Sequence, residues 1–226
     1  SLTLYNYKYI FSKDGMRDLS WYRNSLIVTA VQTVASLFFS ALVGYGLAIY
    51  KFKGRSLLFG LVLFTMMIPV EILILPLYKT MMAFRLLNTY AGIILPFIVV
   101  PFAVFFFRQY AIGLPMELLD AARIDGCTEF GSFFRVMLPL MAPAFGAMAI
   151  LQALFSWNNV LWPLIVLRTP EMFTLPIGLS SLLTPYGNNY VLLISGAVLA
   201  VLPILALFLL FQRSFIAGLT IGAVKG

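Results

Sequence analysis

Apolar residues in this chain are gathered into five long runs that are separated by short polar segments. The runs cover about 25–50, 57–78, 90–112, 140–166 and 190–211. A helix that crosses a membrane needs roughly 20 mostly apolar residues, and each run meets that length. The pattern therefore predicts an all-α membrane protein, a polytopic bundle of transmembrane helices with five spans in this sequence.

The composition agrees with lipid as the main surrounding. Apolar residues make up 62% of the chain and charged residues only 10%, whereas a soluble domain is about half apolar and a quarter charged. The net charge of +7 comes from 15 basic residues that are spread singly between the apolar runs. Because they form no basic face, they indicate interfacial anchors, and we expect membrane lipid and not nucleic acid as a partner.

Several kinds of chemistry are excluded by residue types that the sequence lacks. The chain has no histidine and a single cysteine, Cys127, which removes histidine metal sites, histidine general bases and internal disulfides. It also has no phosphate-binding loop of the G-x-x-x-x-G-K-[ST] type. We therefore predict no catalytic residue, no metal site and no cofactor in this chain, which is not expected to be an enzyme.

Lysine and arginine placement sets the expected orientation, because cytoplasmic loops carry an excess of these residues. The segments expected inside are 51–55, 113–139 and 212–226, and those expected outside are 79–89 and 167–189. When the N-terminal stretch is set aside, the inside carries eight basic residues, Arg108 near the end of the third span included, and the outside three. Including that stretch gives eight against seven, so the preference depends on leaving it out.

The odd number of spans bears on the ends of the chain, because five spans put the two termini on opposite sides of the membrane. The opening from Ser1 to Arg23 is polar and aromatic, with no initiator methionine and no signal-peptide pattern. We expect one transmembrane domain over 1–226 that lacks its first span, so that the full chain has six.

A ridge of small residues runs along the first predicted span. Ser36, Ser40, Gly44 and Ala48 recur every four residues, with Thr29, Gln32 and Thr33 on or near the same stripe. Small residues at this spacing let two helices approach closely, so helix packing is the favoured interpretation. The other interpretation is that these residues line a water-filled pathway.

Glu71 is the only acidic residue inside a predicted span. Intramembrane carboxylates are costly and are functional candidates by default. Pro69 and Pro76 flank this residue and free backbone groups, so Glu71 either lines a pathway or makes a structural polar bond.

The segment 113–139 differs from the other connections, because it holds four carboxylates: Glu117, Asp120, Asp125 and Glu129. Pro115 suits the first turn of a helix that Gly126 can end. Thr128 can cap a second helix, whose apolar face consists of Phe130, Phe133, Phe134, Met137 and Leu138. With Pro139 closing it, the segment is expected to form two short amphipathic helices hinged at a glycine.

One pattern in this segment resembles a known family. Asp120-Ala121-Ala122-x-x-x-Gly126, nine residues, then Val136-x-Leu138-Pro139 is similar to the EAA motif of ATP-binding-cassette importer permeases. Asp120 stands for the usual Glu and Val136 for Ile. The likeness to the carbohydrate, maltose-type branch, in particular its second permease subunit, runs from about Leu4 to Gly226. It is carried by Asn24-Ser25, Phe52-Lys-Gly-Arg55, Met67-Ile-Pro69, Arg123-Ile-Asp-Gly126, Ser156-Trp-Asn158, Trp162-Pro163, Thr174-Leu-Pro176 and the ending Gly218-Leu-Thr-Ile-Gly-Ala-Val-Lys-Gly226.

The resemblance implies a permease subunit in a bacterial or archaeal cytoplasmic membrane. Its implied partners are a second permease subunit in a heterodimer, two ATPase subunits that bind ATP and Mg, an extracytoplasmic solute-binding protein and a sugar. The residues implied to couple to the ATPase are Glu117, Asp120, Ala121, Ala122, Arg123, Asp125 and Gly126, with a contacting tail of Gly222, Lys225 and Gly226. Pathway candidates are Glu71, Gln152, Trp157 and Asn158, although an interfacial aromatic belt also explains the tryptophans, Trp162 above all.

Two other functions are less consistent with the sequence. A self-contained secondary transporter or channel would need coupling charges at mid-membrane, where only Glu71 is available. An intramembrane enzyme could assemble neither a catalytic dyad nor a metal site within the spans. The solute stays open among oligosaccharides, monosaccharides and glycerol phosphates, since family likeness alone points to carbohydrate.

Overall fold

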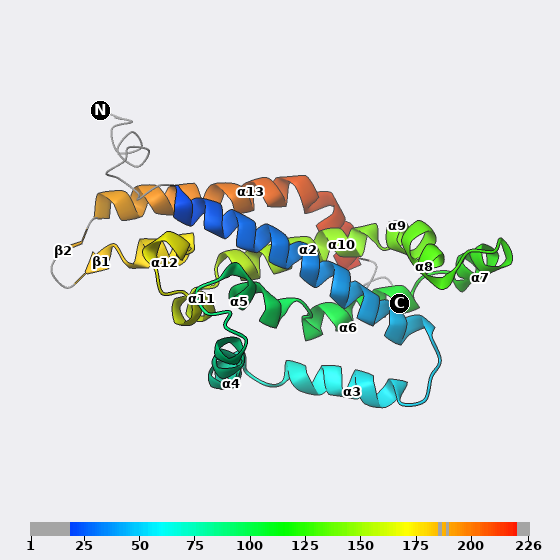
Figure 1. The fold of residues 1–226 in the computed structure, drawn as a ribbon. Helices are drawn as coiled ribbons and strands as arrows, with labels where there is room; N and C mark the ends of the chain where they lie inside the picture. Colours follow the sequence, from blue (N-terminus) through cyan, green and yellow to red (C-terminus); the bar gives the residue numbers. More distant parts are fainter. Residues whose placement is uncertain (1–18, 185–186, 189, 221–226) are drawn as a thin grey trace. The chain divides into compact units, whose positions relative to one another are not determined.

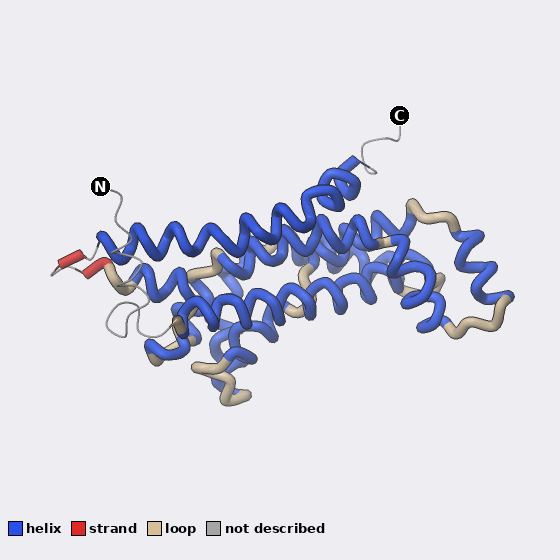
Figure 2. The backbone as a smooth tube through the Cα atoms, turned by 90° about the horizontal axis from the view of Figure 1, so that it is seen from above, coloured by secondary structure: helices blue, strands red, loops and turns tan. Residues whose placement is uncertain are grey.

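The computed structural model describes the backbone of residues 19–184, 187–188 and 190–220, and nearly all of it is helical (Figure 1, Figure 2). In chain order the elements are α2 (Ser20–Ile49), α3 (Arg55–Met66), α4 (Val70–Ala83), α5 (Tyr90–Ile94), the 3-10 turn η1 (Leu95–Phe97), α6 (Pro101–Ile112), α7 (Met116–Ile124), α8 (Glu129–Ser132), the π-helical turn η2 (Phe133–Met137), α9 (Leu138–Leu140), α10 (Ala142–Trp157), α11 (Leu161–Val166), the 3-10 turn η3 (Pro170–Met172), α12 (Leu175–Ser180), the strands β1 (Leu183–Thr184) and β2 (Gly187–Asn188), and α13 (Tyr190–Thr220). The all-α fold class is confirmed. The antiparallel pair β1–β2 is a local detail that the apolar pattern did not predict.

The chain forms two compact units, and each is described separately. Among the described residues, unit 1 consists of those up to Thr33, Val70–Phe97 and those within Ala153–Leu209. Unit 2 consists of Val34–Pro69, Ile98–Gln152 and the described residues from Leu210. The division falls inside α2, α10 and α13, so each of these helices contributes to both units.

The predicted spans are present, but three of them are interrupted. In the described part of the chain, Ser20–Ile49 and Leu193–Gln212 are long and apolar enough to span a membrane. Three bent helix pairs bring the number to as many as five. The three bent pairs are broken at 67–69, at 98–100 and at Met141, and the predicted run 140–166 is interrupted again at 158–160. Proline explains the first two: Pro69 disfavours a helical residue before it, and Pro101 opens α6 in the position where a missing N–H costs nothing.

Unit 2 is built on a close approach of α2 and α6. A Cβ atom on Gly44 would lie 2.8 Å from the carbonyl oxygen of Val104 and 2.9 Å from the amide nitrogen of Arg108. The hydroxyl of Ser40 accepts a hydrogen bond from the amide of Val100 at 3.1 Å. The small residues of the ridge therefore serve helix packing here, which agrees with the favoured interpretation.

The helix α3 lies alongside α6 in the same unit (Figure 1). The ring of Phe59 stacks on Phe105 with 6.3 Å between centroids. The guanidinium of Arg108 lies 3.8 Å from the centroid of the Phe59 ring and donates to the carbonyl of Leu47. The charge of Arg108 is thus held by a cation–π contact and a hydrogen bond.

The core of unit 1 is centred on two tryptophans and a leucine, Trp21, Trp157 and Leu175, all buried. The indole nitrogen of Trp21 donates to the carbonyl of Pro170 at 2.8 Å, and that of Trp157 donates to the carbonyl of Ala200 at 3.1 Å. A Cβ atom on Gly178 would overlap the ring of Trp21, so α12 packs directly on this ring.

Candidate functional site

The segment 113–139 forms two short helices joined at a glycine, as the sequence predicts. Gly126 has a φ of +79°, a left-handed conformation that glycine adopts at little cost. The Thr128 hydroxyl accepts from the amide of Gly131 at 3.1 Å and caps α8. Two details differ from the expectation. Pro115 is the N-cap of α7 and lies before its first turn, and Pro139 lies inside α9, where a first-turn proline loses no hydrogen bond and so does not end the helix.

The inner face of α7 packs against its own chain. Leu119 is fully buried in a cluster with Tyr45, Phe133 and Met137, which connects α7 with α2 and η2 inside unit 2. Ala122 is also buried, with 7% of its surface exposed. This second alanine of the EAA-like motif therefore faces the protein interior.

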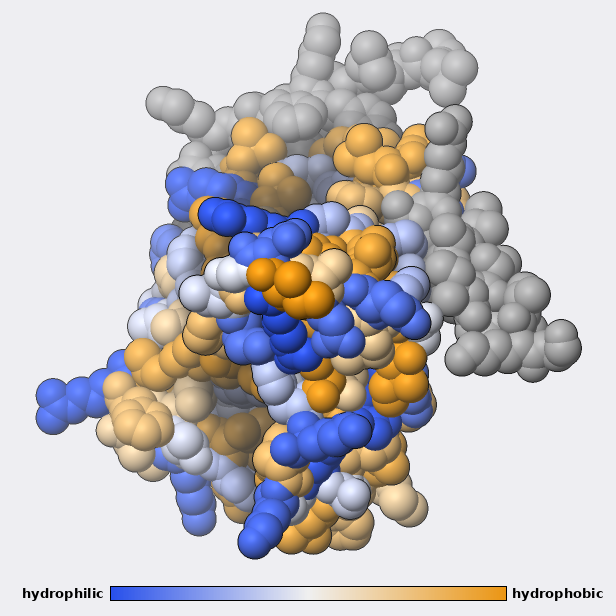
Figure 3. Space-filling model, turned by 90° about the vertical axis from the view of Figure 1, so that its right-hand side faces the viewer, coloured by the Kyte–Doolittle hydropathy of each residue, from blue (hydrophilic) through white to orange (hydrophobic). Residues whose placement is uncertain are grey.

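The outer face of α7 is exposed and mixed in character. It carries Glu117, Asp120, Ala121 and Ile124, which follow one another at helical spacing. Ile124 is 86% exposed, and Phe130 at the start of α8 is 72% exposed. Hydrophilic side chains gather between apolar ones on the face that carries α7 and α8 (Figure 3). Exposed apolar groups in a polar setting are typical of a protein-binding surface.

Arg123 ties the two short helices together. Its guanidinium donates to Asp120 at 3.2 Å and, through two nitrogens, to both carboxylate oxygens of Glu129 at 3.1 and 3.2 Å. The Tyr50 hydroxyl donates to the same carboxylate at 2.8 Å. The bonds from Arg123 and then Tyr50 lower the pKa of Glu129, whereas burial, followed by the bond to Glu129, raises the pKa of Tyr50. Asp125, the C-cap of α7, is exposed.

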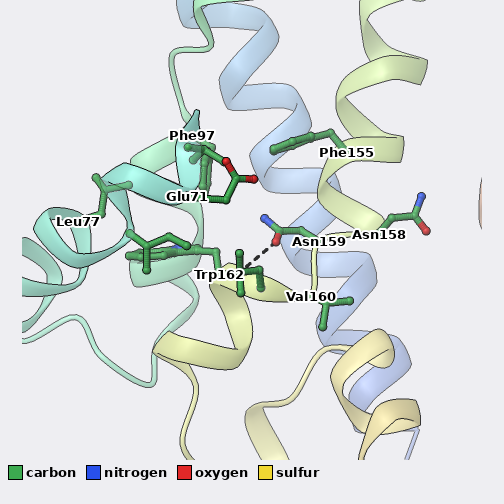
Figure 4. Close-up of a pocket in the computed structure, with 11 residues that line it drawn as sticks. Glu71, Leu77, Phe97, Phe155, Asn158, Asn159, Val160 and Trp162 are labelled. Atoms are coloured by element: carbon green, nitrogen blue, oxygen red, sulfur yellow. Dashed lines mark hydrogen bonds between the residues drawn. The ribbon is translucent and has the colours of Figure 1, made fainter. Parts of the chain in front are cut away.

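A second site is a cavity of about 420 Å³ in unit 1 (Figure 4). It is lined by Val70, Glu71, Ile74, Leu77, Phe97, Phe155, Asn158, Asn159, Val160, Leu161 and Trp162. These residues come from the first half of α4, from η1, and from the end of α10, the break after it and the start of α11. Figure 4 shows the carboxylate of Glu71 close to the rings of Phe97 and Phe155, with the amide of Asn159 turned toward it.

The structure brings together two of the four pathway candidates. Glu71 and Asn158 both line the cavity, although the Asn158 amide points away from Glu71 and donates to the Leu154 carbonyl at 3.0 Å. Trp157 is buried in the core of unit 1, and Gln152 is buried in unit 2.

Asn159 is the polar lining residue that the sequence reasoning missed. Its position directly after Asn158, in a run of otherwise apolar residues, is the signal that could have found it. Its side-chain oxygen accepts from the amide of Trp162 at 3.3 Å, which leaves its amide group directed at the cavity. Trp162 itself is 3% exposed and donates to the carbonyl of Gly92 at 3.1 Å.

The expected outer loop is fixed to α2 and α5 through Asn24. This side chain is fully buried, and its amide donates to the carbonyls of Glu171 and Phe173 at 2.7 and 3.0 Å. Its oxygen accepts from the Tyr90 hydroxyl at 2.6 Å. The hydroxyl of Ser25 in turn accepts from the amide of Leu175 at 2.8 Å. The Asn24-Ser25 pair noted in the sequence thus holds the backbone of 171–175.

The two remaining expectations concern the C-terminal tail and metal binding. The tail residues Gly222, Lys225 and Gly226 lie outside the described residues. Among the residues that the structure describes, no group of three or more acidic or cysteine side chains is placed to hold a metal ion.

Comparison with protein families finds one match over most of the chain. Residues 36–220 match the family described as "Binding-protein-dependent transport system inner membrane component". A solved structure of a bacterial ABC transporter involved in the import of the acidic polysaccharide alginate has a similar fold, with a TM-score of 0.81. That match covers 93% of this chain and 78% of the other at 23% identity, so it shows the fold alone.

Curated relatives are similar over nearly the whole chain. The arabinooligosaccharides transport system permease protein AraQ of Bacillus subtilis is 63% identical over 221 residues, which is 98% of this chain and 78% of the relative. The protein of the same name from Halalkalibacterium halodurans is 62% identical over 226 residues, 100% of this chain and 81% of the relative.

Proposed function

The chain belongs to the family of binding-protein-dependent transport system inner membrane components, and from this membership we propose a specific substrate class and a specific ATPase contact. It is a permease subunit of an ATP-binding-cassette importer, a multi-pass protein of the bacterial inner membrane. It works with a partner permease, an ATPase and a binding protein. Like its relatives it is a transport subunit and not an enzyme, and not a self-contained secondary transporter or channel.

The proposed substrate is an arabinose-containing oligosaccharide. The observation that carries this proposal is the identity of 62–63% to two arabinooligosaccharide permeases across 98–100% of this chain. The aligned region covers the whole chain and so includes α4, α10 and α11, which line the cavity.

Reconstitution tests the substrate proposal. The chain is assembled in proteoliposomes with its partner permease, two ATPase subunits that bind ATP and Mg, and the binding protein. ATP inside the vesicles should then drive accumulation of labelled arabinotriose, with an excess of lactose competing weakly. Accumulation of lactose in preference to arabinotriose refutes the proposed substrate and leaves the permease function intact.

The outer face of α7 is the proposed contact with the ATPase. Ala121 adds almost no bulk between Asp120 and Ile124, so a partner groove can approach the helix backbone there. The exposed side chains of Ile124 and Phe130 supply apolar area that water disfavours. Asp120, whose side chain is 64% exposed, can reach a basic group on the partner as well as Arg123.

The internal contacts of α7 offer a route for transmitting motion within unit 2. Leu119 packs on Tyr45 of α2. The hydrogen bonds from Arg123 and Tyr50 to Glu129 connect the hinge at Gly126 with the C-terminal end of α2. A displacement of α7 by the ATPase therefore acts on α2 through both a packed core and a polar network. The tail of Gly222, Lys225 and Gly226 is proposed as a second contact with the ATPase.

Substitution of Ala121 tests the contact. Ala121→Glu places a large charged side chain on an exposed surface, so folding should be retained while ATPase attachment or transport falls at least about tenfold. Ala83→Glu, at an exposed alanine that ends α4, is the matched control and should transport normally. Normal transport by Ala121→Glu would falsify the contact. Ala122→Glu is a poorer test, because the buried Ala122 has no room for the larger side chain.

The outer loop is the proposed docking site for the binding protein. Arg168 and Glu171 are exposed, while the backbone around them is held by Asn24 and Asn88, so the loop offers a fixed surface. Replacing Arg168 and Glu171 by alanine should weaken binding-protein-stimulated ATP hydrolysis and leave the assembled complex intact. Unchanged stimulation would assign docking to other residues.

A further inference from the structure

The cavity in unit 1 combines polar and aromatic groups in a part of the chain that is otherwise apolar. Glu71 is exposed at its edge and has no hydrogen bond or ion pair within the described residues. A carboxylate turned to lipid hydrocarbon is strongly disfavoured. This face of unit 1 must therefore meet water, solute or protein in the membrane, and not lipid chains.

The backbone around the cavity gives a second reason for this orientation. Residues 158–160 are not helical, and they line the cavity between α10 and α11. Non-helical backbone at membrane depth is tolerated where it borders protein or a water-filled space, since its polar groups need partners. The backbone amides of Asn158 and Asn159 already donate to the carbonyls of Leu154 and Ser156, so what the break brings to the opening is the side chain of Asn159.

The groups that converge here match the chemistry of a sugar. The oxygens of Glu71 can accept hydrogen bonds from hydroxyl groups, and the free amide of Asn159 can donate to a hydroxyl or ring oxygen. Phe155 is 50% exposed, and its ring together with Phe97 offers an apolar surface for the C–H face of a sugar ring. The volume of about 420 Å³ lies within the range of about 300–1,000 Å³ that small-molecule sites occupy.

The charge of the cavity restricts the sugars that fit. Its lining contains one carboxylate and no lysine or arginine. An anionic solute would meet the like charge of Glu71 without a cation to offset it. Building on the proposed function, we propose that this cavity is a saccharide subsite of the permease, in which Glu71 and Asn159 bind hydroxyl groups and Glu71 selects neutral over anionic sugars.

Protection of an engineered thiol tests this subsite in the assembled importer. Val160→Cys, in a Cys127→Ala background, places the thiol in the cavity lining, and the complex is held in nanodiscs so that both faces meet the solution. Arabinotriose should slow labelling of this thiol, and Glu71→Gln should raise the half-protecting concentration about tenfold, because hydrogen bonds to charged groups are worth roughly that much. Trigalacturonate, an anionic sugar, should protect the thiol poorly. Glu71→Gln should reduce the difference between the half-protecting concentrations of trigalacturonate and arabinotriose.

Controls make each outcome decisive. Lys79→Gln removes a charge from the same helix, outside the cavity, and should leave protection unchanged. Equal protection by arabinotriose with and without the Glu71 carboxylate overturns the role of this residue. Absence of protection in a complex that accumulates arabinotriose overturns the subsite but not the proposed function, whereas absence of both overturns the proposed substrate and the subsite together.

Discussion

Replacing Asn24 should release the outer loop from α2. Asn24→Leu is nearly isosteric, but it removes three hydrogen bonds to the carbonyls of Glu171 and Phe173 and to the Tyr90 hydroxyl. Two of these bonds, those to Glu171 and Phe173, hold the loop itself, and at about 1 kcal/mol for each the loop loses about 2 kcal/mol. Because each 1.4 kcal/mol is a factor of ten, the population of the opened loop should rise about 30-fold.

Limited proteolysis measures this opening. Trypsin needs an extended chain on both sides of Arg168, whose amide is held by the side chain of Asn88 at 3.0 Å. When opening is fast relative to cleavage, the cleavage rate follows the open population, so Asn24→Leu should be cut after Arg168 about 30 times faster than the wild type. Asn24→Asp keeps the acceptor for Tyr90 and loses the donors, so most of the effect should persist.

The matched control is Asn158→Leu, an exposed asparagine whose side chain bonds only within its own helix. Ser25→Ala, which removes the single bond to the amide of Leu175, should give an intermediate rate. If Asn24→Leu and Asn158→Leu are cleaved at the same rate, Asn24 does not anchor the loop.

Three further predictions concern other parts of the chain. Gly44→Ala should destabilise the protein by about 1–3 kcal/mol, measured by thermal unfolding, because its Cβ would lie within 2.9 Å of the backbone of α6; an unchanged midpoint would mean that the helices move apart freely. Glu129→Gln should lower the free energy of unfolding at neutral pH. This difference from the wild type should vanish as pH falls through the pKa of Glu129, which lies below its ordinary 4.5, because the stabilising carboxylate is then protonated. A difference in unfolding free energy that persists at lower pH would indicate an effect of packing. Thiol labelling from outside should modify a cysteine at position 170 and not one at position 129, and the reverse result would invert the predicted topology.

The apolar runs were sufficient to predict the class of the protein and the position of its helices. The same runs could not show where the helices break, because a run of apolar residues has the same composition whether it is straight or interrupted. Pro69 and Pro101 could have indicated two of the breaks. The break at 158–160 has no proline and becomes visible only through the cavity that it borders.

The candidate site was predictable where its signal is local in sequence. Gly126 and Thr128 act on their own neighbours, so the hinge and the cap followed from spacing alone. The partners of Asn24, and the residues that share the cavity with Glu71, lie far away along the chain, and no periodicity reports such contacts. Ala121 and Ala122 are chemically identical, and only the packing of Leu119 against α2 decides which alanine faces outward.

The pairing of α3 with α6 has a consequence for how the chain is synthesised. α3 has 12 residues, and at about 1.5 Å for each it reaches about 18 Å, well short of the roughly 30 Å hydrocarbon layer. α6 also has 12 residues and carries Arg108, whose insertion alone is unfavourable. The Phe59 ring on α3 is the partner of that guanidinium. We therefore expect α3 to stay beside the translocon until α6 has been synthesised. The two helices would then enter the bilayer together and not one after the other.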